Sequence, residues 1–131
     1  MTQSVVFVYG SLKRGYALHH LLRTAQFLGP ARTQPLYRLF DLGSYPGLVE
    51  WPDGREIHGE LYAVTPQNLL LLDDAEGVSE GLYVRRPILL QPPERILLTT
   101  APLTAESPPA ADAWFWLNAT AGRRDCGNSW P

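Results

Sequence analysis

The stretch Val6–Gly15, VFVYGSLKRG, passes from a run of apolar residues directly into a loop bounded by two glycines. Its apolar part belongs to Ser4–Tyr9, whose continuous β-branched and aromatic character predicts a strand that is buried on both faces. Leucines at positions 18, 21 and 22 then predict a short helix over Ala17–Ala25. A strand, a glycine-bounded loop and a helix in this order have the outline of a nucleotide-binding element.

The loop lacks the side chains that bind a nucleotide. Gly10 and Gly15 have the spacing of the P-loop glycines, but Tyr16 and Ala17 stand where a P-loop needs Lys and Ser or Thr. What remains is a turn whose backbone N–H groups can converge on an anion, and a carboxylate is the expected ligand. The alternative interpretation is that Gly10 only permits a tight turn, which Ser11 solvates.

The rest of the chain has the pattern of short strands and one well-marked helix. Strands are predicted at Arg38–Leu42, Leu48–Trp51, His58–Val64, Tyr83–Leu90, Arg95–Thr100 and Ala113–Leu117. A helix is predicted over Pro66–Glu76, because Thr65 can cap it and Gly77 suits its exit. The segment Ala101–Asp112 is predicted to be an exposed loop. The pattern indicates one α+β domain over residues 1–131, with a curled sheet or small barrel.

Composition and charge argue against several classes of function. The 131 residues carry a formal net charge of −2 with scattered basic residues, which argues against a nucleic-acid partner. No apolar run approaches the ~20 residues that span a bilayer, so no membrane partner is expected. The single cysteine, Cys126, and the lack of a secretory signal pattern predict a reducing, cytoplasmic location. No Cys or His spacing supports a metal site.

An acidic residue lies on the apolar stripe of the predicted helix. At 100° per residue, one arc of this helix carries Leu69, Leu72, Asp73 and Glu76. Burial beside leucines raises the pKa of a carboxyl group, which makes Glu76 a better proton acceptor and a candidate general acid/base. The helix dipole also disfavours negative charge at this end. The alternative is that Glu76 pairs with Arg85 or Arg86, or lies in solvent at the helix end.

Several motifs, in this order along the chain, resemble one known family. They are Tyr9-Gly10-Ser11-Leu12, Tyr45-Pro46-Gly47-Leu48, Gly59-Glu60-Leu61-Tyr62, Leu72-Asp73-Asp74-Ala75-Glu76-Gly77, Tyr83-Val84-Arg85-Arg86 and the Gly-x-x-Trp of residues 127–130. Together they resemble the gamma-glutamylcyclotransferase-like family, which includes the gamma-glutamylamine cyclotransferases and the plant AIG2-like proteins. The resemblance covers essentially the whole chain, and the first motif together with the acidic Asp-Asp-x-Glu-Gly motif is its most specific part.

The resemblance implies a fold, a reaction and a site. The fold would be a small mixed β-barrel with one or two short helices and a cavity between the first loop and the acidic helix end. The reaction would convert a small gamma-glutamyl amine or peptide to 5-oxoproline and a free amine, as a cofactor-independent lyase or acyltransferase without a metal. Glu76 would be the general acid/base, and the substrate-binding residues would be Tyr9, Gly10, Ser11, Leu12 and Tyr83.

Some features depart from the family pattern. Ala75 stands where an aromatic residue often precedes the glutamate, and Trp116 stands where tyrosine is usual, which affects substrate identity more than chemistry. Glu80 is a second acid near the helix end and the alternative base. A different class of function is also open, namely a non-catalytic module that binds a small carboxylate on the same fold. The oligomeric state, the leaving amine and the pathway are left open by the sequence.

Overall fold

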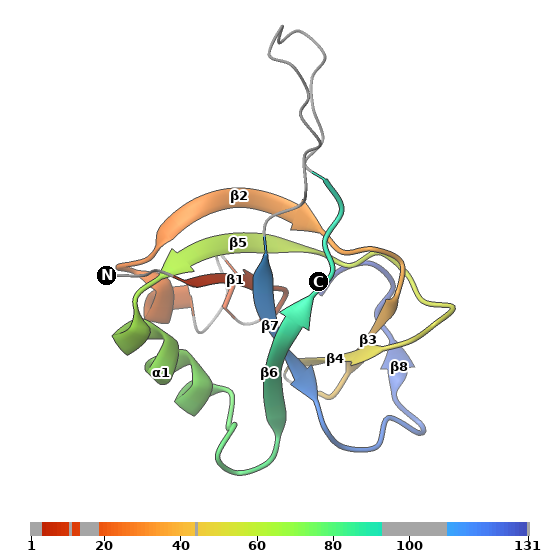
Figure 1. Cartoon of the computed structure of the whole chain (residues 1–131). Coiled ribbons are helices and arrows are strands. Elements are labelled where there is room, and N and C mark those ends of the chain that lie inside the picture. Colours follow the sequence, from red (N-terminus) through yellow and green to blue (C-terminus); the bar gives the residue numbers. More distant parts are fainter. Residues whose placement is uncertain (1–3, 11, 14–18, 44, 93–109, 131) are drawn as a thin grey trace, which may run out of the picture.

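The computed structural model describes residues 4–10, 12–13, 19–43, 45–92 and 110–130 (Figure 1). Its elements are β1 (Ser4–Val8), the 3₁₀ helix η1 (His19–Leu22), β2 (Gln26–Arg32), β3 (Tyr37–Asp41), β4 (Pro46–Glu50), β5 (His58–Val64), α1 (Pro66–Ala75), β6 (Tyr83–Ile88), β7 (Ala111–Trp116) and β8 (Arg124–Asp125). One sheet has the order β2-β5-β1-β7-β6, and a smaller one has the order β4-β3-β8. The mixed sheet and the helix confirm the α+β class.

The described strands form two open sheets, so the expectation of a closed barrel is wrong for this part of the chain. The edges of the larger sheet, β2 and β6, approach each other beyond their ends, where Thr33 and Leu90 form an isolated bridge. A single bridge is not a ladder, and closure into a barrel needs continuous pairing between the edge strands. In Figure 1, α1 lies on one side of β6 and β7, and the smaller sheet lies on the other.

Strand β1 lies in the middle of the larger sheet, as its apolar sequence predicts. It pairs antiparallel with β5 and parallel with β7. Phe7 and Tyr9 belong to one core cluster, whereas Val6 and Val8 belong to the other, so both faces of the strand are buried. Because β1 ends at Val8, the next two residues leave the sheet at the point where the first loop begins.

Helix α1 begins and ends as its capping residues predict. The Thr65 hydroxyl accepts a hydrogen bond from the Asn68 backbone N–H at 3.1 Å. At the other end Gly77 has a φ of +67°, a left-handed conformation that favours glycine. The N–H groups of Gly77 and Val78 donate to the carbonyls of Asp74 and Asp73, which is the Schellman pattern. This pattern fixes the backbone of Glu76, the C-cap residue between them.

Other parts of the sequence reading differ from the structure. Strand β2 was not predicted, because Gly29 and Pro30 have the appearance of a turn; an edge strand tolerates proline, and the register shifts between Phe27 and Gly29. The short strand β8 was also not predicted. The expected helix over Ala17–Ala25 is the shorter η1, with residues 17 and 18 outside the described residues. The predicted strand at residues 95–100 also lies outside them, whereas the C-terminal end of the predicted loop is part of β7.

The described residues contain neither a membrane-spanning helix nor a cluster of metal-binding side chains. None of their helices is long and apolar enough to cross a membrane. Within the same residues, no group of three or more His, Cys, Asp or Glu side chains is placed to hold a metal ion.

Candidate active site

A pocket lies where the end of β1 faces the C-terminal end of α1. It is lined by Val8, Tyr9, Gly10, Leu12, Tyr45, Pro46, Glu76, Tyr83 and Trp114. Its empty volume is about 300 Å³, including the space at its mouth. Tyr45, which is 37% exposed, lies at the rim, whereas Tyr9, Leu12, Tyr83 and Trp114 are buried.

The Glu76 carboxylate enters this pocket without a compensating charge. Its backbone N–H donates to the Leu72 carbonyl at 3.0 Å, so the residue continues the last turn of α1. Among the described residues, no hydrogen bond or ion pair is formed by its side chain. Burial raises the pKa of Glu76 from 4.5 to about 7. A carboxyl group with this pKa can accept and return a proton near neutral pH.

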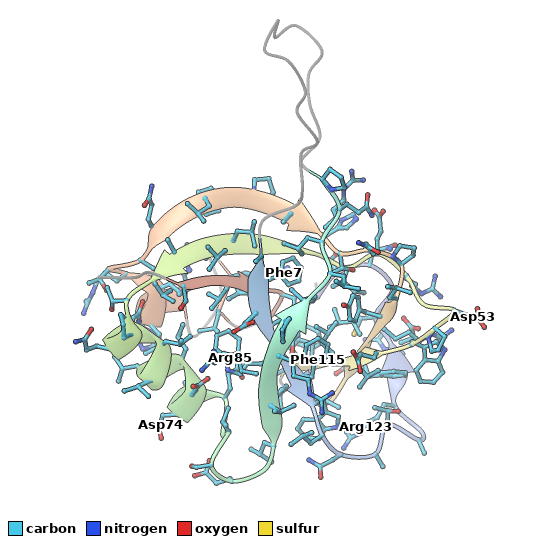
Figure 2. All side chains as sticks on the ribbon, viewed as in Figure 1. Phe7, Asp53, Asp74, Arg85, Phe115 and Arg123 are labelled. Atoms are coloured by element: carbon cyan, nitrogen blue, oxygen red, sulfur yellow. The ribbon has the colours of Figure 1, made fainter. Side chains whose placement is uncertain are left out.

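The arginines that might have neutralised Glu76 are bound elsewhere. Arg85 belongs to β6, and its side chain points toward α1 (Figure 2). Its guanidinium group pairs with Asp73 at 2.9 Å and with Asp112 at 3.0 Å. Nη1 of Arg86 lies 3.7 Å from Oε1 of Glu50. The alternative interpretation, in which Glu76 is one half of a structural ion pair with either arginine, does not describe this arrangement.

Two buried tyrosines flank Glu76. The Tyr9 hydroxyl donates to the Trp114 carbonyl at 2.6 Å, and the Tyr83 hydroxyl donates to the Pro46 carbonyl at 2.7 Å. Burial, together with the charge of Glu76, raises the pKa of both tyrosines well above the usual value. Both hydroxyl groups therefore stay protonated, and neither has a proton left to donate to the Glu76 carboxylate. These two hydrogen bonds fix Tyr9 against Trp114 and Tyr83 against Pro46, which are all lining residues of the pocket.

Gly10, at the start of the first loop, lies close to Pro46 on the other side of the pocket. A Cβ atom built on Gly10 would lie 2.6 Å from Cγ and 2.8 Å from Cδ of Pro46, closer than real Cβ contacts allow. The Lys13 N–H donates to the Gly10 carbonyl at 2.9 Å, and the His19 ring Nδ1 lies 3.0 Å from the Leu12 carbonyl. Among the described residues, the N–H groups of Gly10 and Leu12 have no acceptor. Backbone donors of this kind can bind an anion that enters the pocket.

An aromatic wall continues the pocket toward its mouth. The ring centroids of Tyr83 and Trp116 lie 5.2 Å apart in an edge-to-face arrangement. The centroid of the Tyr45 ring lies 6.4 Å from each of these two centroids. The indole Nε1 of Trp116 is buried and has no hydrogen-bond partner among the described residues. Sequence reasoning did not assign Tyr45 and Pro46 to the site, although the motif Tyr45-Pro46-Gly47-Leu48 was one of the family matches and could have indicated them.

The structure brings most of the predicted site residues together. Tyr9, Gly10, Leu12 and Tyr83 line one pocket with Glu76, although they come from distant parts of the sequence. Ser11 lies outside the described residues. Glu80, the alternative base, is exposed and does not line the pocket; its carboxylate accepts from the Ser79 hydroxyl at 3.3 Å. The geometry therefore favours Glu76 over Glu80, and the roles of these residues remain predictions.

Similar proteins include several whose names refer to cyclotransferases. The human gamma-glutamylaminecyclotransferase is 40% identical over 118 residues, which cover 84% of this chain and 73% of that protein. An Arabidopsis thaliana protein, whose name provisionally assigns it as a gamma-glutamylcyclotransferase, is 38% identical over 115 residues, or 82% of this chain. A Vibrio cholerae protein with a similar provisional name is 47% identical over 76 residues, or 58% of this chain. The matches span 62% of the Arabidopsis protein and 64% of the Vibrio protein, less than two thirds of each.

Solved structures have the same fold. An AIG2-like protein from Mus musculus superposes with a TM-score of 0.73 and 26% identity, covering 100% of this chain and 90% of that chain. A gamma-glutamyl cyclotransferase superposes with a TM-score of 0.67 over 95% of this chain and 70% of that chain; at 20% identity this likeness shows the fold alone. The profile of the family described as gamma-glutamyl cyclotransferase, AIG2-like matches residues 6–130. With this match and the human relative, the chain belongs to the gamma-glutamyl cyclotransferase, AIG2-like family.

Proposed function

We propose that this protein is a cyclotransferase that converts a small gamma-glutamyl amine or peptide to 5-oxoproline and a free amine, with Glu76 as the general acid/base. The observation that carries the proposal is the Glu76 carboxylate, whose pKa burial raises to about 7 in a pocket without a cationic partner among the described residues. The family match and the human gamma-glutamylaminecyclotransferase, whose name states this type of reaction, support it.

The proposed reaction is an intramolecular acyl transfer. The α-amine of the gamma-glutamyl group attacks its own amide carbonyl, forming a C–N bond that closes a five-membered ring. The bond between that carbonyl carbon and the leaving nitrogen then breaks. Glu76 takes a proton from the attacking amine and returns it to the leaving nitrogen, so the protons balance without another reactant. Holding the substrate in a folded-back conformation supplies the orientational part of the rate.

The first loop supplies the complementary binding group. The N–H groups of Gly10 and Leu12 would bind the α-carboxylate of the substrate or the oxyanion that develops during attack. Tyr9 and Tyr83 would contact the substrate through their rings and keep the pocket dry around Glu76. The proposed reaction needs no cofactor. The single cysteine supports a location in a reducing compartment such as the cytoplasm.

Release of 5-oxoproline by the purified protein tests the proposal. The substrates should include gamma-glutamyl amino acids, gamma-glutamyl-ε-lysine, glutathione and simple gamma-glutamyl alkylamines, because the leaving amine is not identified. Release from any of them identifies the reaction and the leaving group. Stabilisation of the fold by 5-oxoproline without turnover across the panel would instead indicate the module that only binds a small carboxylate.

The pH dependence of the rate should report the titration of Glu76. A general base must be deprotonated in the free enzyme, so kcat/KM should fall as the pH decreases through about 7. For a freely solvated glutamate, the fall in kcat/KM would instead be centred at about pH 4.3. The measurement is kcat/KM for one substrate between pH 4 and pH 9. The residual activity of Glu76→Gln is the control for titration of the substrate itself, and a flat wild-type profile down to pH 4 would contradict the assignment.

A further inference from the structure

We propose that Asp73 is a positioning residue for Glu76, because its carboxylate joins the last turn of α1 to Arg85 on β6 and to the indole of Trp114 on β7. The inference rests on the proposed role of Glu76, and it concerns where the Glu76 carboxylate lies rather than what it does. Asp73 itself does not line the pocket.

The contacts of Asp73 are directional and come from two strands. Its Oδ1 accepts from Arg85 Nε at 2.9 Å and from Trp114 Nε1 at 2.9 Å. Its Oδ2 accepts from Arg85 Nη2 at 3.2 Å, which completes a two-point contact with the guanidinium group. Arg85 Nη1 in turn donates to Asp112 Oδ2 at 3.0 Å. Three half-buried charged groups therefore hold the end of α1 against the sheet.

The same network reaches the opposite side of the pocket. Trp114, whose ring nitrogen donates to Asp73, accepts the Tyr9 hydroxyl proton at its backbone carbonyl. Both Trp114 and Tyr9 line the pocket. One residue thus connects the helix end that carries Glu76 with the wall that faces it. The backbone carbonyl of Asp73 also accepts the Val78 N–H at 3.1 Å, in the capping pattern that encloses Glu76.

A physical conflict explains why this turn needs such a contact. The C-terminal end of a helix carries a partial negative charge, and three acidic residues lie in or next to the last turn of α1. The positive charge of Arg85, paired with Asp73, offsets part of this repulsion. Asp73 binds the arginine, so that Glu76 can stay half-buried in the pocket without an ion pair of its own. The ion pair therefore belongs to Asp73, and the proton-transfer group keeps its raised pKa.

The chain offers two matched controls. Asp74 follows Asp73 in the same turn with the same charge, but it is exposed and points away from the protein (Figure 2). Arg86 follows Arg85 on β6, but it is exposed and faces Glu50 rather than the helix. Asp73→Asn and Asp74→Asn therefore remove the same charge from neighbouring positions. Arg85→Lys and Arg86→Lys keep the charge and change only the geometry of the contact.

The experiment measures turnover and the Glu76 titration separately. For each variant, kcat and KM are measured for the best substrate of the panel. The carboxyl carbon of Glu76 is followed by NMR from pH 4 to pH 9 in protein labelled at the glutamate carboxyl carbon, with Glu76→Gln used for assignment. Asp73→Asn should lower kcat by about 10- to 100-fold with little change in KM, as expected for a displaced catalytic group. Its Glu76 midpoint should also fall by about one pH unit, a tenfold change in proton affinity.

The controls decide between positioning and general stability. Asp74→Asn and Arg86→Lys should leave kcat and the Glu76 midpoint near the wild-type values, whereas Arg85→Lys should change both in the same direction as Asp73→Asn. Equal behaviour of Asp73→Asn and Asp74→Asn would overturn the proposal. Should Asp73→Asn not fold, the comparison of Arg85→Lys with Arg86→Lys decides it in the same way. If the wild-type protein releases no 5-oxoproline, the proposed function fails, but the titration still tests the positioning.

Discussion

Replacing Glu76 with Gln is expected to lower 5-oxoproline release by about 10³-fold or more, while the protein stays folded. One proton-transfer group typically contributes about 10²- to 10⁴-fold, and here the same carboxylate would serve both proton transfers. Glutamine keeps the size of the side chain but can neither accept nor return the proton. The measurement is kcat for the variant and the wild type with the same substrate at pH 8. A variant that keeps its rate within about tenfold of the wild type would remove Glu76 from the proposed role.

The same substitution should make the fold more stable at high pH. The pKa of Glu76 is raised from 4.5 to about 7 by folding, so the folded protein favours the neutral form. The cost of ionising the buried group is absent below pH 4.5, grows between pH 4.5 and pH 7, and is fully present above pH 7. At pH 8 the variant should gain about 3 kcal/mol in free energy of unfolding, and at pH 4 nothing. Denaturant unfolding at both pH values measures the gain, and an equal effect at both would contradict the raised pKa.

Replacing Gly10 with Val should weaken binding of 5-oxoproline by at least about tenfold and lower kcat/KM further. The Cβ of any other residue would lie 2.6 Å from Pro46 Cγ, so the loop and Pro46 must move apart. This movement displaces the N–H groups that are proposed to bind the carboxylate, and overpacking of this kind costs about 1–3 kcal/mol of stability. Calorimetry with 5-oxoproline measures the affinity. Normal affinity in this variant would contradict the assignment of the loop.

A double substitution separates the steric cause from a general loss of stability. Gly10→Ala introduces the same Cβ atom with less bulk, and Pro46→Ala removes the Cγ and Cδ atoms that it would meet. If the clash is the cause, the double variant should recover affinity that Gly10→Ala loses. Gly81→Ala is the matched control, because Gly81 has a φ of +76° and open space around its Cβ position. It should lose stability through backbone strain without losing affinity for 5-oxoproline.

Where a structural feature depends on local signals, the sequence was sufficient to predict it. Ser4–Val8 forms the buried central strand because its apolar run has no polar face to expose. Helix α1 begins after Thr65 and exits at Gly77 because a cap hydroxyl and a left-handed glycine act within a few residues of the helix end. Strand β2 was not predicted, because proline in a strand is tolerated only at an edge, and edge position is not visible in local sequence.

The sequence by itself determined that this chain has an α+β fold of the gamma-glutamyl cyclotransferase, AIG2-like family, with an acid on the apolar face of its helix. It could not determine which acid Arg85 would bind, because Asp73, Glu76 and Asp112 are all available to it in sequence. Only the packing of α1 against β6 and β7 placed Arg85 between Asp73 and Asp112. The physical reason is that an ion pair forms over a few ångströms, and those distances exist only after distant segments have packed together.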